Sequence, residues 1–281
     1  MTVTPEGDFE RDTRVEGADG RYRATLSDAW ALWGPAGGYV STIALRAAGA
    51  HSRFDRPASY ACSYLGVASF GPIDVAVTTL RSAKRAEALR VELLQSDQVF
   101  LDATVWTIDG EMQGMEHDVA TMPAVPGPDR LQGWFEQTPQ ERNPYRRFWS
   151  NIDERMTDQW FGDWRDHPIR PPVRDSWYRF RGAPVFEDPY VDAGRSVMIV
   201  DTIGWPAAAV AYPARVPFVA PTIELSVRFH RSARGSEWLF ARTEAPYAGD
   251  GLLWSTSQVW SSDGRLVASG GQHMLCRPTP G

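Results

Sequence analysis

Hydrophobic and polar positions along this chain follow the same order twice. Residues 59–108 predict four strands, with a turn rich in basic residues between the second and the third. Residues 222–275 repeat that order. The offset of about 165 positions is far longer than the roughly 20–50-residue period of solenoids and propellers. We therefore interpret the chain as two copies of one whole domain.

Each copy also carries one predicted helix ahead of its strands. Tyr39 to Ala50 places apolar residues on one face at helical spacing, directly after the glycine-rich segment 30–38. In the second copy, residues 195–211 predict the corresponding helix. Pro206 should kink or break it, because proline lacks an N–H and clashes with the preceding turn.

Shorter elements and a linker complete the two copies. Residues 9–27 predict two short strands, and residues 147–156 and 173–181 predict two more at the start of the second copy. Residues 123–140 are rich in proline, glycine, glutamine and charge, which is typical of a linker. We expect an N-terminal domain over residues 1–122, a linker over 123–144 and a C-terminal domain over 145–281.

Composition places the chain among globular proteins and argues against several partners. Of its 281 residues, 43 % are apolar and 23 % are charged. The net charge of −6 disfavours nucleic-acid binding. No apolar run is long enough to cross a membrane, and the acidic start lacks a secretory signal. Cys62 and Cys276 stand alone, as reduced thiols of a cytoplasmic protein do.

Several familiar catalytic motifs are missing from the sequence. There is no G-x-S-x-G elbow, no Walker loop and no G-x-G-x-x-G. The five histidines never fall at metal-ligand spacing. We therefore expect no covalent serine mechanism, no metal and no cofactor.

Four short segments of the chain match motifs that occur together in one known family. Ile223 to Arg231 is similar to a family strand that ends in Phe-His-Arg, and Ser236 to Leu239 resembles an Asn-Glu-Trp-Leu segment. Asp263 to Gln272 is similar to Asp-Gly-x-Leu-Val-Ala-Ser-x-x-Gln, and Gly37 to Val40 matches a glycine pair that opens the first helix. The chain thus resembles the acyl-CoA thioesterase II family. The resemblance implies an α+β double hotdog fold, with two tandem hotdog domains that each wrap an antiparallel sheet around a central helix.

The resemblance also implies an activity, the hydrolysis of an acyl-CoA in fatty acid metabolism. In the family, Asp, Thr and Gln side chains of the second hotdog hold the water that attacks the thioester carbonyl, with no covalent intermediate. Carried over by position, the Asp falls on Glu224 and the Gln on Gln272. A carboxylate of this kind acts as general base, and an amide orients the water. The alternative is that Glu224 pairs with Arg228 or Arg231 at the surface.

The hydroxyl group of the family site has no direct counterpart at the matching position. The Thr falls at or next to Pro246, which has no hydroxyl. Thr243 lies on the same predicted strand and reaches the correct face only if a bulge intervenes. Ser255 and Ser257 on the next strand are other candidates.

Four further residues are candidates for contacting the acyl-CoA. The amides of Gly38 and Tyr39, at the start of a helix, suit the thioester oxygen in the manner of an oxyanion hole. Arg81 and Arg231 are candidates for the phosphates of coenzyme A.

Two other functions and two assemblies remain open at this point. Pro246 at the hydroxyl position favours a non-hydrolytic protein that binds acyl-CoA or an acyl carrier. A hydratase of the same fold would need an Asp and His signature that the sequence lacks. Hotdog sheets often pair into longer ones, so we expect a monomer or a homodimer.

Overall fold

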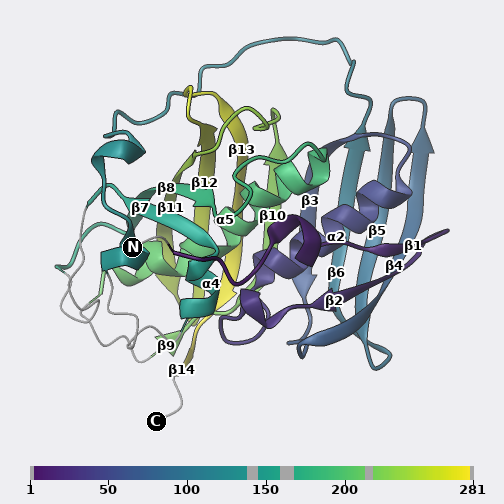
Figure 1. Cartoon of the computed structure of the whole chain (residues 1–281), viewed down its shortest axis with the longest axis horizontal. Helices are drawn as coiled ribbons and strands as arrows, with labels where there is room; N and C mark the ends of the chain where they lie inside the picture. The colour runs from purple at the N-terminus through teal and green to yellow at the C-terminus, as the bar shows by residue number, and fades with distance from the viewer. Residues whose placement is uncertain (1–2, 138–144, 159–167, 213–217, 279–281) are drawn as a thin grey trace.

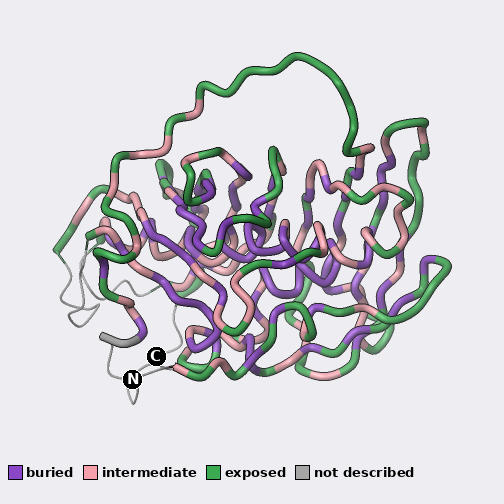
Figure 2. The backbone as a smooth tube through the Cα atoms, turned by 45° about the horizontal axis from the view of Figure 1, so that its top comes forward, coloured by how far each residue is buried: buried purple, intermediate pink, exposed green. Residues whose placement is uncertain are grey.

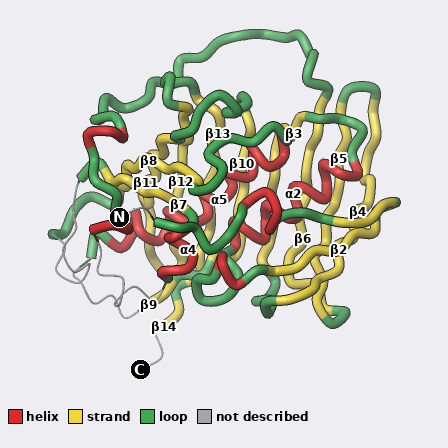
Figure 3. The backbone as a smooth tube through the Cα atoms, in the orientation of Figure 1, coloured by secondary structure: helices red, strands yellow, loops and turns green. Residues whose placement is uncertain are grey.

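The computed structural model describes residues 3–137, 145–158, 168–212 and 218–278, and its centre is one long antiparallel sheet around two helices (Figures 1 and 3). In the described residues the sheet has twelve strands. The N-terminal half runs in the order β1 (Glu16–Ala18), β2 (Arg21–Leu26), β4 (Gly71–Ala83), β5 (Ala86–Gln95), β6 (Gln98–Ile108) and β3 (Arg56–Tyr64). The C-terminal half continues with β10 (Thr222–Phe229), β13 (Leu266–Leu275), β12 (Leu252–Ser261), β11 (Leu239–Gly249), β8 (Val173–Phe180) and β7 (Ile152–Met156).

The remaining elements are two long helices and several short segments. The long helices are α2 (Gly37–His51) and α5 (Pro189–Ala209). The short ones are α1 (Phe9–Asp12), η1 (Asp28–Trp30), η2 (Pro128–Arg130), α3 (Trp134–Gln137), α4 (Arg146–Ser150) and the strand pair β9 (Phe218–Val219) and β14 (Arg277–Pro278).

The two halves join through direct pairing of β3 with β10. Tyr60 lies opposite Val227 in this antiparallel ladder, and both side chains are buried. Directly opposed residues of a ladder share one face of the sheet, so the inner faces of the two halves are continuous. The predicted double hotdog fold is thereby confirmed.

The two long helices lie against the inner face and against each other. A side chain at Gly38 would come within 2.7 Å of the Met198 backbone, and one at Gly194 would come within 2.4 Å of Thr42. Glycine at these two positions lets the helix backbones approach closely. The contact brings the first turn of α2 to the middle of α5.

Burial follows strand alternation and accounts for the core (Figure 2). Along β2 the side chains of Tyr22, Ala24 and Leu26 are buried, whereas their neighbours in the strand are exposed. Apolar residues at every second position thus cover the helices, as period-two patterning requires. The same alternation in the sequence predicted the strands.

Two of the predictions for the second copy were wrong in part. Pro206 does not end α5, which continues to Ala209. It stands in the last turn, so the loss of its N–H affects only one carbonyl near the end of the helix. The segment 147–156 is not one strand, because its first half belongs to α4 and its second half forms β7.

The connection between the halves arches over one end of the molecule and then packs against the C-terminal half of the sheet (Figure 1). Leu131 joins a cluster with Trp177, Trp238, Phe240 and Trp260. The described part of the predicted linker is therefore partly packed, and residues 138–144 lie outside the described residues. The domain boundaries at 122 and 145 stay predictions.

No helix in the described ranges combines the length and apolarity needed to cross a membrane.

Candidate active site

Three polar side chains from three different elements meet on the inner side of the second hotdog. Asp201 comes from the middle of α5, Thr222 from the start of β10 and Gln272 from β13. The Thr222 hydroxyl lies 2.7 Å from Gln272 Oε1 and 3.2 Å from Asp201 Oδ1. The three groups thus form one hydrogen-bonded set.

The orientation of the Gln272 amide follows from its partners. Its Nε2 donates to the backbone carbonyls of Val200 and Asp201, each at 3.0 Å. Carbonyls only accept, so the nitrogen must face α5 and the oxygen must face Thr222. Gln272 is buried, with 1 % of its surface exposed, and this fixed amide ties β13 to the helix.

Asp201 is a half-buried carboxylate with few compensating donors. The Gly38 amide, in the first turn of α2, donates to Asp201 Oδ2 at 2.7 Å. Burial raises the pKa of Asp201 to about 6, against the lowering effect of the hydrogen bonds from Gly38 and Thr222. A carboxylate whose pKa lies near neutrality is suited to accept a proton from water.

A β-bulge explains why Thr222 reaches the inner face. The ladder between β10 and β13 pairs Thr222 with Met274 but Glu224 with His273, so Ile223 is the extra residue. One inserted residue reverses the alternation of faces on either side of it. Thr222 therefore shares the inner face with the buried Met274, although two-residue spacing would group it with Glu224.

Gly204 allows the tight fit of Gln272 against α5. A Cβ atom at this position would lie 2.0 Å from Gln272 Nε2 and 2.6 Å from Ser255 Oγ. Ser255 lies opposite Gln272 in the β12–β13 ladder and is fully buried. In the described part of the chain its hydroxyl has no hydrogen-bond partner, so the site keeps an unused polar group beside Gln272.

The structure does not bring Glu224, the predicted base, together with Gln272. Gln272 pairs with Leu225 across the ladder and faces inward, whereas Glu224 pairs with His273 and is exposed on the outer face. Adjacent strand residues point to opposite faces, so the two side chains lie on opposite sides of the sheet. The carboxylate that joins Gln272 through the Thr222 hydroxyl is instead that of Asp201.

Of the hydroxyl candidates on β11 and β12, Ser255 lies beside Gln272, whereas Thr243 and Ser257 do not join the group. Thr243 does face inward, but it is fully buried and its hydroxyl lies 2.5 Å from that of Ser257. Their strands are separated from β10 by β13, and the hydroxyl that contacts Asp201 and Gln272 is that of Thr222. Pro246 is exposed, and the missing hydroxyl at that position leaves the site intact.

The Gly38 amide lies at the site but makes a different contact from the predicted one. The Gly38 amide already donates to Asp201, so it positions the carboxylate and is not a free oxyanion donor. The role predicted for the Tyr39 backbone amide stays a prediction. The Tyr39 side chain is fully buried, and its hydroxyl donates to the carbonyl of Asp12 at 2.8 Å. It stacks beside Trp30 in the core of the first half.

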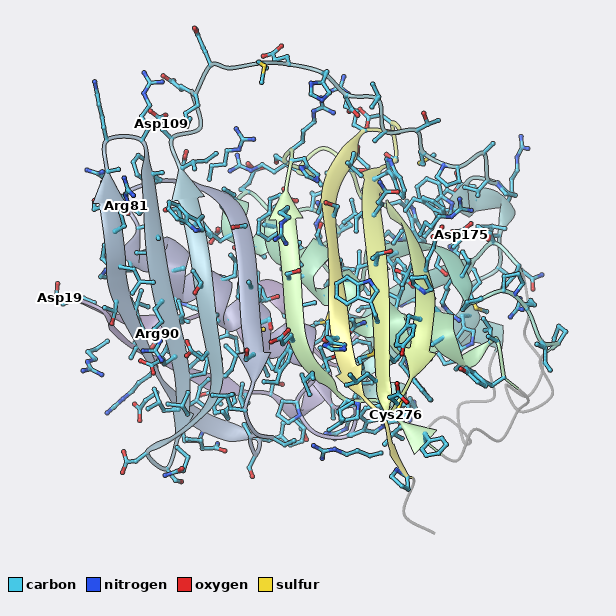
Figure 4. All side chains as sticks on the ribbon, turned by 180° about the vertical axis from the view of Figure 1, so that it is seen from behind. Asp19, Arg81, Arg90, Asp109, Asp175 and Cys276 are labelled. Atoms are coloured by element: carbon cyan, nitrogen blue, oxygen red, sulfur yellow. The ribbon has the colours of Figure 1, made fainter. Side chains whose placement is uncertain are left out.

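The two arginines predicted to bind phosphate lie away from this group. Arg81 is exposed on β4, with four strands between β4 and β13. In Figure 4, Arg81 lies toward one end of the row of strands, and Asp175 of the second half lies toward the other end. Arg231 follows the end of β10 that is distant from Thr222, and it forms an ion pair with Asp118 of the connection. The Asp118 carboxylate therefore already neutralises Arg231.

Comparison with known families identifies the family of this chain, independently of the geometry of the site. Residues 26–108 match the model of the acyl-CoA thioesterase N-terminal domain, and residues 116–276 match that of the acyl-CoA thioesterase C-terminal domain. The chain belongs to the acyl-CoA thioesterase family. As a member of this family it is a thioester hydrolase.

Solved structures of similar shape agree with this acyl-CoA thioesterase fold over almost the whole chain. A putative thioesterase II from Thermobifida fusca is 20 % identical, with a TM-score of 0.81 over 98 % of this chain and 99 % of that one. An acyl-CoA thioesterase II from Mycobacterium marinum is 22 % identical, with a TM-score of 0.78 over 97 % and 99 %. A dehydratase domain of PpsC from Mycobacterium tuberculosis, solved with C12:1-CoA, is 12 % identical, with a TM-score of 0.55 over 95 % and 99 %. At these identities the likeness shows the fold.

Two of the three residues of this candidate site were not among the residues predicted from the sequence, although each left a signal. Asp201 interrupts a run of buried apolar residues in α5, from Val197 to Val200. A lone carboxylate in such a run deserves a functional interpretation, because burying it is costly. Thr222 left a weaker signal, since only the bulge at Ile223 turns it inward.

Proposed function

We propose that the protein hydrolyses an acyl-CoA to the free acid and coenzyme A, using a water molecule activated by Asp201. The observation that carries the proposal is the half-buried Asp201 carboxylate with its raised pKa, hydrogen-bonded to Thr222, which also contacts Gln272. Family membership supplies the substrate class. The mechanism needs no covalent enzyme intermediate.

In the proposed reaction, Asp201 removes one proton from the water as its oxygen attacks the thioester carbonyl carbon. The resulting tetrahedral intermediate expels the coenzyme A sulfur, which takes up the proton held by Asp201. The products are the carboxylic acid and the thiol. Carboxylate general bases work best when their pKa lies close to the working pH.

The hydrogen-bond pattern gives Asp201 a partner both with and without this proton. When Asp201 is protonated, Gln272 Oε1 accepts the proton of the Thr222 hydroxyl. The Thr222 oxygen, 3.2 Å from Asp201 Oδ1, is then free to accept from a protonated Asp201. The ionised carboxylate keeps its hydrogen bond from Gly38. Both protonation states of Asp201 thus have partners.

The alternative of a non-hydrolytic binding protein loses its original support. It rested on the missing hydroxyl at Pro246, and Thr222 now supplies a hydroxyl beside Asp201 and Gln272.

A cytoplasmic location and a homodimer stay predictions. Cys62 and Cys276 are free thiols, which suits a reducing compartment.

The proposed function is tested by thiol release from acyl-CoAs of increasing chain length. Hydrolysis of at least one substrate over many turnovers is the expected result, and the series also gives the chain preference. Saturable binding of the same acyl-CoAs without thiol release would overturn hydrolysis and support the binding protein.

The pH dependence of kcat/KM should report the ionisation of Asp201. Only the ionised carboxylate accepts a proton from water, so activity should be low below its pKa of about 6 and reach a plateau above it. Initial rates on one acyl-CoA, taken from about two pH units below this pKa to about two above it, measure this profile, with enzyme stability checked at each pH. A flat profile across pH 6 would contradict Asp201 as the base.

Replacement of Thr222 by Val removes the hydroxyl and keeps the shape of the side chain. We expect kcat to fall by about 10–100-fold, because Gln272 Oε1 and Asp201 both lose a partner in a buried site. Thr222→Ser keeps the hydroxyl and should retain most of the activity. Equal rates for Thr222→Val and wild type would show that the hydroxyl has no part in the reaction.

A further inference from the structure

A group of hydroxyl and thiol side chains from the first hotdog lies beside Asp201 and has no part in the hydrolysis as proposed so far. Tyr64 Oη lies 2.7 Å from Ser41 Oγ, and Ser41 Oγ lies 3.6 Å from Cys62 Sγ. Ser41 comes from α2, and the other two residues come from β3. Ser41 is fully buried and Cys62 is nearly so, which gives this short polar chain a fixed geometry.

Tyr64 and Asp201 border the same small space beside Gly37. A Cβ atom at Gly37 would lie 2.9 Å from Tyr64 Oη and 2.9 Å from Asp201 Oδ2. Because Gly37 has no side chain, one small group entering next to it can contact both oxygens. A water molecule and a thioester carbonyl are groups of this size.

The Tyr64 hydroxyl is a donor at neutral pH. Burial, followed by the nearby Asp201 carboxylate, raises the pKa of Tyr64 well above its usual value, so the phenol keeps its proton. Burial also raises the pKa of Cys62 to about 11, so the thiol stays protonated. The thiol can then donate to Ser41 and Ser41 to Tyr64, which leaves the Tyr64 proton for a further acceptor.

The reaction requires a donor of this kind. The carbonyl oxygen of a thioester gains negative charge as water attacks, and the Gly38 amide at the start of α2 already donates to Asp201. The Tyr64 hydroxyl borders the same space beside Gly37 and carries no negative charge of its own.

We propose that Tyr64 is a further catalytic residue, whose hydroxyl donates a hydrogen bond to the thioester carbonyl oxygen as charge develops on it. The proposal rests on the proposed function. It makes the active site a composite, in which the second hotdog supplies the base and the first supplies the oxyanion donor. No proton leaves Tyr64, which acts only through the hydrogen bond.

The test compares Tyr64→Phe with wild type in thiol release from the best acyl-CoA of the series. Removal of one oxyanion donor costs about 100- to 1,000-fold in kcat, and we expect a loss in this range with KM changed by less than about threefold. Tyr190→Phe is the matched control. It removes a buried tyrosine hydroxyl whose 2.6 Å bond goes to the Phe54 carbonyl, and it should leave kcat unchanged.

A second measurement separates catalysis from substrate binding and from folding. In the inactive Asp201→Asn background, the Kd for the intact acyl-CoA should be the same with and without the Tyr64→Phe substitution, because the hydrogen bond strengthens only in the transition state. Ser41→Ala should lower kcat less than Tyr64→Phe does, since it removes only the group that orients Tyr64.

The outcomes distinguish the two proposals. Wild-type hydrolysis that is lost in Asp201→Asn but retained in a folded Tyr64→Phe would overturn the role of Tyr64 alone. A loss of acyl-CoA affinity in place of kcat would make Tyr64 a substrate-binding residue and would also overturn the proposal. Absence of hydrolysis by wild type on every acyl-CoA would remove the proposed function and the role of Tyr64 with it.

Discussion

Asp201→Asn is expected to lower kcat for acyl-CoA hydrolysis by about 1,000-fold or more, because the substitution removes the general base and keeps its shape. The asparagine oxygen can still accept the hydrogen bond that the Gly38 amide donates to Asp201. Thiol release under single-turnover conditions measures the residual rate. A calorimetric or fluorescence Kd for the acyl-CoA checks that binding survives.

Glu224→Gln is the matched control for this experiment. It removes a carboxylate from the exposed outer face of β10, and we expect kcat within about twofold of wild type. Thermal unfolding of Asp201→Asn should show no loss of stability, since a neutral amide replaces a carboxylate whose burial is unfavourable. Equal losses in the two variants, or full activity in Asp201→Asn, would contradict the assignment of the base.

Gly204→Ala should lower kcat by about 100-fold, because the added methyl group occupies the space of the Gln272 amide. Its Cβ would lie 2.0 Å from Gln272 Nε2, so either the amide turns away from α5 or the helix moves off the sheet. Either response breaks the bonds from Gln272 to the carbonyls of Val200 and Asp201. The measurement is kcat and KM on the preferred acyl-CoA, together with the melting temperature.

The melting temperature shows which response has occurred. Overpacking a core position costs about 1–3 kcal/mol, so a moderate decrease with a folded, inactive protein is the expected result. Gly235→Ala is the control, because a Cβ there meets no atom within 4 Å, and it should leave activity and stability unchanged. Normal activity in Gly204→Ala would mean that the position of the Gln272 amide has no influence on the reaction.

The position of the site explains why both halves of the chain are needed. Asp201, Thr222 and Gln272 belong to the second hotdog, yet the amide that holds Asp201 comes from Gly38 in the first. The close approach of α2 and α5 at Gly38 and Gly194 is what makes this contact. An isolated second domain would carry the three side chains without the hydrogen bond from the Gly38 amide to Asp201.

The sequence by itself determined the fold and the chemical class of the protein. The repeated strand order and apolar alternation predicted two sheets with one helix each, because period-two and period-3.6 patterns report burial directly. The resemblance in Asp263 to Gln272 identified the family and proposed Gln272, which the structure places beside Thr222. Local patterns sufficed for these conclusions since each depends on neighbours in the chain or on a short motif.

The tertiary structure decided which residues accompany Gln272. A single bulge at Ile223 turns Thr222 inward and leaves Glu224 outward, and a one-residue change of register is invisible in the strand pattern. Asp201 became a candidate base only when α5 packed against the first turn of α2, which partly buries the carboxylate and raises its pKa. The face on which a strand residue lies and the burial of a side chain depend on long-range packing. That packing determines which polar side chains lie beside Gln272.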